Sequence, residues 1–313
     1  MPFELIVNDR KDVIVLKDIT GNCEAEIYCT GALLNAFRVQ TAAGNYNVVH
    51  GFNSVEEVKE KITAGFHSAK LSPFVCRLDK GSYVLAGKSY TIEKFYLPPH
   101  AIHGIIYDET FSIASTHVDG KSASVTLQYH YSGQDSGYPF PYDISIQWTL
   151  KEKQTLSVTT TVQHANDNYI PYADGWHPYF KLDTATIDEC TLQFDSFTQV
   201  QFDSTLIPTG KVLQDVRFQQ AATLQGVELD NCFTLDPLTQ HSGCVLTGKQ
   251  LRLNIRPEKA YPYLQVYTPP HRESIAIENL SSAPDAFNNG IGLIMMEKNK
   301  SYSFTTSYII ETV

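Results

Sequence analysis

The sequence lacks the long apolar run that a membrane-spanning helix needs, which is roughly 18 or more uncharged residues. Its first ten residues also lack a basic segment followed by an apolar stretch, the pattern of a secretory signal. We therefore expect a cytoplasmic protein that has no membrane partner.

Positive charge is scarce as well. The 313 residues contain 24 Lys and Arg against 34 Asp and Glu, which gives a formal net charge of −10, and no local Lys/Arg cluster offsets it. A polyanion such as a nucleic acid would be repelled by this surface. We therefore expect no nucleic-acid partner.

Closely spaced cysteines and glycine-rich phosphate loops are also missing. The six cysteines are scattered without a Cys-x-x-Cys pair: Cys23, Cys29, Cys76, Cys190, Cys232 and Cys244. In a chain of this length without a signal they indicate reduced, mostly buried thiols, and a zinc site built from them is not expected. Without a glycine-rich fingerprint the sequence predicts no nucleotide cofactor.

Alternation of apolar and polar residues, in contrast, is abundant. Residues 142–150 place four large apolar side chains on one face and polar ones on the other; the apolar ones are Ile144, Ile146, Trp148 and Leu150. The same alternation recurs in residues 125–131, 156–162 and 302–310. A period of two predicts half-buried antiparallel strands.

Turn signals separate these runs. Asp119-Gly120 predicts a hairpin in which both turn residues have positive φ, and Ala86-Gly87 and Thr247-Gly248 predict similar turns. One early segment is helical: residues 54–57 form a capping-box pattern, and the apolar residues that follow share one helical face. We expect residues 1–313 to form one all-β domain with a short early helix, and a sandwich, a barrel and a jelly roll all fit this pattern.

A β-rich scaffold says little about function, so the argument must come from a site. Five candidate residues lie beside turns in aromatic surroundings: Arg77, His103, His177, Asp230 and Glu278. Each also has a purely structural interpretation. The histidines could be packing residues, Arg77 a surface ion-pair partner, Asp230 a turn cap and Glu278 a charge at a strand end. His100 and His103 could bind a metal ion, but no further ligands follow at a recognisable spacing.

Taken in order, these segments resemble the aldose 1-epimerase (galactose mutarotase) family over nearly the whole chain. His177, with Tyr179 and Phe180, is similar to the family's Asn-His-x-Tyr-Phe-Asn-Leu string, which contains its general-acid histidine. Glu278, with the following Pro284-Asp285-Ala286, is similar to the string that carries the family's catalytic glutamate.

Other segments match the family less closely. Arg77 ahead of a hairpin, His103-Gly104 and Asp230 before Cys232-Phe233 are similar to its substrate-binding segments. Four residues depart from the family pattern: Cys76, Trp176 and Lys181 stand where asparagine is usual, and Ile105 stands in place of a glycine.

The resemblance implies a large antiparallel β-sandwich, the galactose mutarotase-like supersandwich. It also implies an isomerase that interconverts the α and β anomers of an aldohexose without cofactor or metal. Glu278 would take the proton of the anomeric hydroxyl, and His177 would protonate the ring oxygen. His103, Arg77 and Asp230 would hold the monosaccharide.

Three alternatives stay open at this stage. A carbohydrate-binding or sensor protein would use the same aromatic and hydroxyl-binding groups without an acid–base pair. A hexose-phosphate 1-epimerase would need a cationic pocket for the phosphate. A glycoside hydrolase would need two carboxylates, for which Asp230 could join Glu278.

Overall fold

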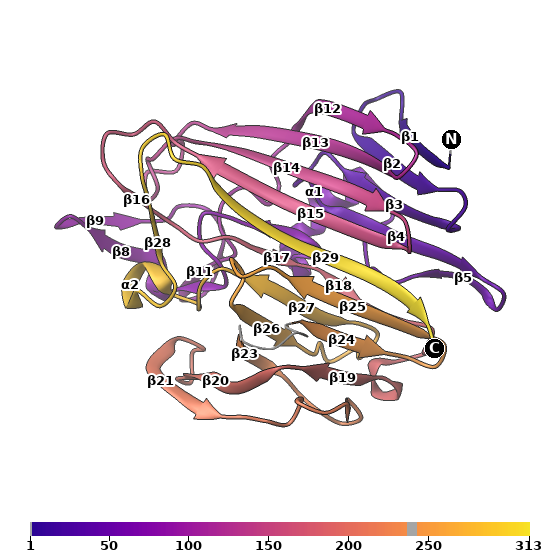
Figure 1. The fold of residues 1–313 in the computed structure, drawn as a ribbon. Helices are drawn as coiled ribbons and strands as arrows, with labels where there is room; N and C mark the ends of the chain where they lie inside the picture. Colours follow the sequence, from indigo (N-terminus) through magenta and orange to yellow (C-terminus); the bar gives the residue numbers. More distant parts are fainter. Residues whose placement is uncertain (1, 237–242) are drawn as a thin grey trace.

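The computed structural model describes residues 2–236 and 243–313 (Figure 1). Two large sheets dominate this part of the chain. The first has nine strands in the order β12 (Ser112–Val118), β13 (Ser122–Tyr131), β14 (Tyr142–Lys151), β15 (Thr155–Gln163), β29 (Tyr302–Thr312), β25 (Leu251–Pro257), β24 (Cys244–Thr247), β19 (Thr191–Phe194) and β22 (Ala222–Thr223). Every strand pair in it is antiparallel.

The second large sheet has eight strands in the described residues. Its order is β21 (Pro208–Gln214), β20 (Ser196–Phe202), β23 (Asp230–Leu235), β26 (Tyr263–Tyr267), β27 (Ile275–Leu280), β17 (Gly175–His177) and β6 (Ala69–Leu71), with β18 (Tyr179–Phe180) also paired to β27. This sheet matters most for function, because it carries most of the candidate site.

Smaller sheets complete the fold. A five-stranded antiparallel meander begins the chain and consists of β1 (Phe3–Val7), β2 (Val13–Asp18), β3 (Cys23–Tyr28), β4 (Leu34–Thr41) and β5 (Gly44–Asn47). Short sheets are formed by β7 (Arg77–Leu78) with β10 (Tyr96–Leu97) and β11 (His100–Ile102), by β8 (Ser82–Leu85) with β9 (Lys88–Thr91), and by β16 (Ile170–Tyr172) with β28 (Ile294–Met296).

The predicted strands are confirmed where the alternation is strongest. Along β14, Ile144, Ile146, Trp148 and Leu150 are buried, whereas Asp143 and Gln147 are exposed. Such a strand buries one face and leaves the other to solvent, which is why its pattern can be read from the sequence.

All three predicted hairpins are present, but the Asp119-Gly120 and Thr247-Gly248 turns do not have the predicted positive φ, and Thr247 pairs with Arg252, so that turn is also longer than two residues. Ala86 and Gly87 both have positive φ and join β8 to β9 as a two-residue turn. The hairpin at Asp119 is also present, but Asp119 and Gly120 do not have positive φ. Here Val118 pairs with Ala123, so the turn is longer, and the Asp119 carboxylate accepts the backbone N–H groups of residues 121 and 122. A side chain therefore closes this turn in place of a left-handed backbone.

The early helix is α1 (Val55–Gly65), and its Ser54 hydroxyl accepts the Glu57 N–H at 3.2 Å, as a helix N-cap does. A second helix, α2 (Ala286–Asn289), has a single turn, too short for sequence periodicity to reveal. Two short 3₁₀ turns span Asp79–Gly81 and Ile187–Glu189. Within the described residues, no helix is long and apolar enough to cross a membrane.

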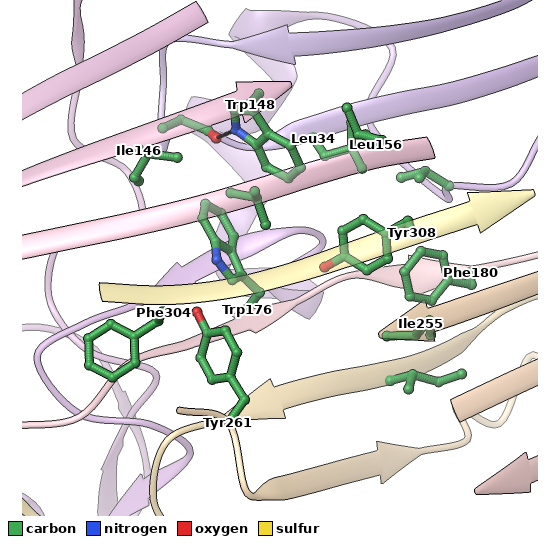
Figure 2. Packing of buried hydrophobic residues seen from close by; sticks show 14 of the residues in the cluster. Leu34, Ile146, Trp148, Leu156, Trp176, Phe180, Ile255, Tyr261, Phe304 and Tyr308 are labelled. Atoms are coloured by element: carbon green, nitrogen blue, oxygen red, sulfur yellow. Dashed lines mark hydrogen bonds between the residues drawn. The ribbon is translucent and has the colours of Figure 1, made fainter. Parts of the chain in front are cut away.

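The two large sheets pack face to face, and Figure 2 shows the core between them. Trp148 of β14 meets Trp176 of β17 with ring centroids 5.4 Å apart. Phe180 of β18 likewise meets Tyr308 of β29 at 5.4 Å. The indole N–H of Trp148 donates to the carbonyl of Ala32 at 2.9 Å and so ties the first sheet to the N-terminal meander. These aromatic contacts confirm the predicted β-sandwich.

Candidate active site

A cavity of about 680 Å³ opens over the eight-stranded sheet, and all five predicted site residues line it: Arg77, His103, His177, Asp230 and Glu278. These residues are far apart in the sequence, and two sheets bring them together. The site is therefore a product of topology as much as of local motifs.

Adjacent strands of the eight-stranded sheet supply its floor. Asp230 begins β23, Glu278 lies in β27 and His177 ends β17. Between β23 and β27 runs β26, in which Gln265 pairs in register with Glu278 on one side and with Cys232 on the other. Rigid strands thus hold the polar side chains in fixed positions.

The short sheet of β7 and β11 supplies the opposite wall. Arg77 pairs with Ile102, and the N–H of His103 donates to the carbonyl of Cys76 at 2.9 Å. The chain turns away at Gly104, where φ is +77° and an added Cβ would lie 2.3 Å from the carbonyl oxygen of Ser72. Glycine at this position therefore allows His103 to face the cavity.

The segment that follows Glu278 in the sequence is hydrogen-bonded to the segment that begins with Arg77. The N–H of Asp285 donates to the Arg77 carbonyl at 2.8 Å, and the Asp285 carboxylate accepts the N–H of Asp79 at 2.9 Å. Asp285 thus anchors α2 to the segment that begins with Arg77, so this part of the motif has a structural task.

His177 and Glu278 form the centre of the site. Nε2 of His177 lies 3.3 Å from Oε1 of Glu278, and the two residues are only 5% and 2% exposed. Glu278 is therefore not an exposed charge at a strand end. Among the described residues, neither Oε2 of Glu278 nor Nδ1 of His177 has a hydrogen-bond partner, so both buried atoms keep unused hydrogen-bonding capacity.

Burial shifts the acid–base properties of this pair in opposite directions. It raises the pKa of Glu278 well above its usual range; the Asp230 carboxylate adds to the rise and Arg77 opposes it. Burial lowers the pKa of His177 to about 3. At neutral pH the ligand-free pair therefore favours an uncharged carboxyl beside an uncharged imidazole, with one mobile proton between them.

Two further rings surround His177. His103 meets it edge to face at 4.7 Å, and Tyr179 stacks on it at 5.1 Å. Burial, and next the positive charge that His177 can carry, lower the pKa of His103 well below 6.5, so His103 is neutral in this setting. A neutral imidazole can accept or donate a hydrogen bond to a hydroxyl group.

Sequence reasoning missed Gln265. Its Nε2 donates to Oδ1 of Asp230 at 2.7 Å, and its buried Oε1 has no partner in the part of the chain that the structure describes. Gln265 therefore orients the Asp230 carboxylate and presents a second acceptor to the cavity. No turn or motif marks it, and the register of β26 against β27 is the signal that finds it.

The departures from the family pattern fall in different places. Trp176 packs in the core between the large sheets (Figure 2). The ammonium of Lys70 lies 4.5 Å from its ring centroid. Ile105 is buried in the same core, and Lys181 lines a separate depression beside His50. Cys76, in contrast, lines the cavity and is the departure that changes the chemistry of its wall.

Cys76 also contributes to a possible metal site. Donor atoms of Cys76, His103 and Glu278 lie within 4.8 Å of one another, and all three residues are buried. A thiol, an imidazole and a carboxylate are suitable zinc ligands. Sequence spacing could not reveal this set because its members come from three separate elements. His100 is not among them; its Nδ1 accepts the Lys80 N–H at 3.1 Å.

Fold and cavity together define a β-sandwich protein with a buried acid–base pair. The aldose 1-epimerase family matches residues 12–309, and the chain belongs to that family of isomerases. The uncharacterized Escherichia coli protein YihR is 26% identical over 241 residues, covering 74% of this chain and 75% of its own. A maltose epimerase from Levilactobacillus brevis is 26% identical over 157 residues, which cover 44% of this chain and 46% of the relative.

Solved structures agree on the fold. A galactose mutarotase-like protein from Clostridium acetobutylicum superposes with a TM-score of 0.86 at 17% identity, covering 99% of this chain and 98% of the other. Galactose 1-epimerase from Lactobacillus acidophilus gives 0.82 at 16% identity over the same shares. At these identities the likeness establishes the galactose mutarotase-like fold and no more.

Proposed function

We propose that this protein interconverts the α and β anomers of an aldohexose by reversible ring opening. The observation that carries the proposal is the contact between His177 and Glu278 at the floor of a cavity that also contains Arg77 and Asp230. Mutarotation needs one proton removed and one proton added at neighbouring oxygens, and this pair can do both.

In the proposed mechanism, sugar binding moves the mobile proton from Glu278 to His177. The Glu278 carboxylate then takes the proton of the anomeric hydroxyl while His177 protonates the ring oxygen and the bond from C1 to that oxygen breaks. The products are an open-chain aldehyde, a neutral carboxyl and a neutral imidazole. After rotation about C1–C2, the reverse transfers close the ring on either face.

Proton balance supports these roles. Ring opening converts the charged pair into the neutral pair, which is the form that burial favours in the ligand-free site. No net proton enters or leaves the protein during the cycle. His103, Arg77 and Asp230 would hold the sugar hydroxyls, and Gln265 would position Asp230.

A sensor protein that merely binds sugar is a weaker explanation. A buried carboxyl with an unpaired oxygen costs stability, and hydroxyl binding alone does not require it. The test is NMR or polarimetry of freshly dissolved α-glucose and α-galactose with and without the protein. Equilibration at the spontaneous rate across common aldoses would contradict the proposal. The cytoplasmic location stays a prediction.

A further inference from the structure

One wall of the cavity holds a thiol that ring opening does not need. Donor atoms of Cys76, His103 and Glu278 lie within 4.8 Å of one another. Among the residues that the structure describes, no other group of His, Cys, Asp and Glu brings three donor atoms this close. Ligand atoms around a tetrahedral zinc ion lie roughly 3.6 Å apart, since each is about 2.0–2.3 Å from the metal. Small side-chain rotations would therefore close the three donors around one ion.

The backbone holds two of these ligands together. Cys76 directly precedes β7, His103 directly follows β11, and the N–H of His103 donates to the Cys76 carbonyl at 2.9 Å. Both residues have positive φ, 49° for Cys76 and 64° for His103. Among residues other than glycine, asparagine and histidine are favoured in this conformation and cysteine is not. Backbone conformation therefore does not explain why a cysteine stands at position 76.

The donor atoms are buried and available. Cys76, His103 and Glu278 are 4%, 7% and 2% exposed, and Cys76 is a free thiol. Within the described part of the chain, Nδ1 of His103 and Oε2 of Glu278 have no hydrogen-bond partner. Buried polar atoms are normally paired, because an unpaired one costs free energy. A bound cation would supply the missing partner for both atoms.

The charges around the three residues suit a divalent cation. A thiolate and a carboxylate together neutralise two positive charges, and an imidazole binds a metal in its neutral form. Burial is the main cause that raises the pKa of Cys76 and of Glu278; the Asp230 carboxylate adds to both rises and Arg77 opposes them. The opposite charges of Arg77 and Asp230 thus offset each other at this position. A thiolate ligand favours zinc over magnesium and calcium, which prefer oxygen ligands.

We propose that Cys76, His103 and Glu278 bind a zinc ion and that the bound ion inhibits the protein. Zinc would displace the thiol proton and the carboxyl proton to solvent, and the cavity would leave its fourth position to water. Glu278 could then no longer take the proton of the anomeric hydroxyl. The inhibitory part rests on the proposed function, whereas metal binding does not depend on turnover and can be measured separately.

The first experiment is titration of chelator-treated protein with Co²⁺, which replaces zinc and absorbs light. We expect one cobalt ion per chain, with a near-ultraviolet band from thiolate-to-cobalt charge transfer that zinc abolishes and magnesium does not. Cys76→Ser should remove the band. Cys29→Ser is the matched control and should keep it, because the free thiol of Cys29 lies elsewhere and donates to the Lys11 carbonyl at 3.4 Å. Absence of the band in wild type, or its persistence in Cys76→Ser, would overturn the proposal.

The second experiment measures mutarotation against zinc concentration, with each variant compared with its own zinc-free rate. We expect zinc to inhibit wild type and Cys29→Ser alike, and a chelator to restore both rates. Loss of an outer partner of a metal ligand typically costs 10–100-fold in affinity, so loss of the ligand itself in Cys76→Ser should raise the half-inhibiting concentration by about 100-fold or more.

The rival zinc ligands are the neighbouring histidines His50, His67 and His271, whose rings lie 4.9 Å and 5.9 Å apart. Inhibition that persists unchanged in Cys76→Ser but disappears in His67→Ala would assign the ion to them and overturn the proposal. Saturating zinc that gives the thiolate site but no inhibition would overturn the inhibitory role. A cobalt–thiolate band in a protein that catalyses no mutarotation would support the metal site and contradict the proposed function instead.

Discussion

Replacing Glu278 by glutamine tests the proposed mechanism most directly. Glutamine keeps the size of the side chain and one acceptor oxygen at the position 3.3 Å from Nε2 of His177, but it cannot take a proton. Loss of a positioned acid–base group costs on the order of 10²–10⁴ in kcat, or about 2.7–5.4 kcal/mol of transition-state stabilisation. Sugar binding should change far less, since Arg77, Asp230 and His103 are retained.

The same substitution has a defined effect on stability. Burial raises the pKa of Glu278 above its ordinary value of 4.5, so above that value the folded state binds more protons than the unfolded state. The contribution of this group to stability therefore falls as pH rises from 4.5 towards the raised pKa. Glutamine has no such dependence. We expect the variant to unfold at the same or a higher temperature than wild type at pH 7.

The assay is NMR mutarotation with thermal unfolding on the same preparation, and Glu258→Gln, on the exposed surface, is the matched control. A folded Glu278→Gln protein with near wild-type turnover would refute the mechanism. A destabilisation of about 3–5 kcal/mol would refute the stability argument, because that loss is typical of breaking a buried structural ion pair.

Three further predictions concern pH, the core and metals. Because burial lowers the pKa of His177 to about 3, kcat/KM should stay level as pH falls through 6.5 and decline only where the His177–Glu278 pair gains a second proton. A pH profile of kcat/KM with parallel circular dichroism can check this. A decline of kcat/KM with an apparent pKa near 6.5 would contradict the prediction. Asp174→Asn should lower the free energy of unfolding, measured in urea, by about 3–5 kcal/mol. The reason is that the fully buried ammonium of Lys70 loses the carboxylate that now lies 2.5 Å away. The double variant Asp174→Asn, Lys70→Met should recover much of that loss. Exhaustive chelation should leave mutarotation unchanged, and loss of activity that one divalent ion restores would make Cys76, His103 and Glu278 ligands of a required metal ion.

Much of the fold was predictable because a strand that buries only one face alternates apolar and polar residues in its sequence. β14 is the clearest case. β27 is the opposite case, since all six of its residues are buried and its sequence shows no alternation. Glu278 therefore looked like a charge after a strand, although it lies inside one.

The candidate site was predictable only where motifs carry it. His177 and Glu278 stand in recognisable strings, but their 3.3 Å contact depends on β17 and β27 being neighbours in one sheet. Gln265 belongs to no motif. The register of β26 against β27 places it beside Glu278.

The positions that depart from the family pattern show why a substitution must be located before it is interpreted. Trp176 directly precedes His177, yet strand alternation turns its side chain to the opposite face, where it packs on Trp148. A change there acts on the core between the sheets. Cys76 is equally close in sequence to Arg77, but it faces the cavity with His103 and Glu278. Its thiol, whose pKa burial raises, places a weakly hydrogen-bonding group where an asparagine would offer a donor and an acceptor. Of these two neighbours of predicted site residues, Cys76 is therefore the one that changes the hydrogen-bonding groups lining the cavity.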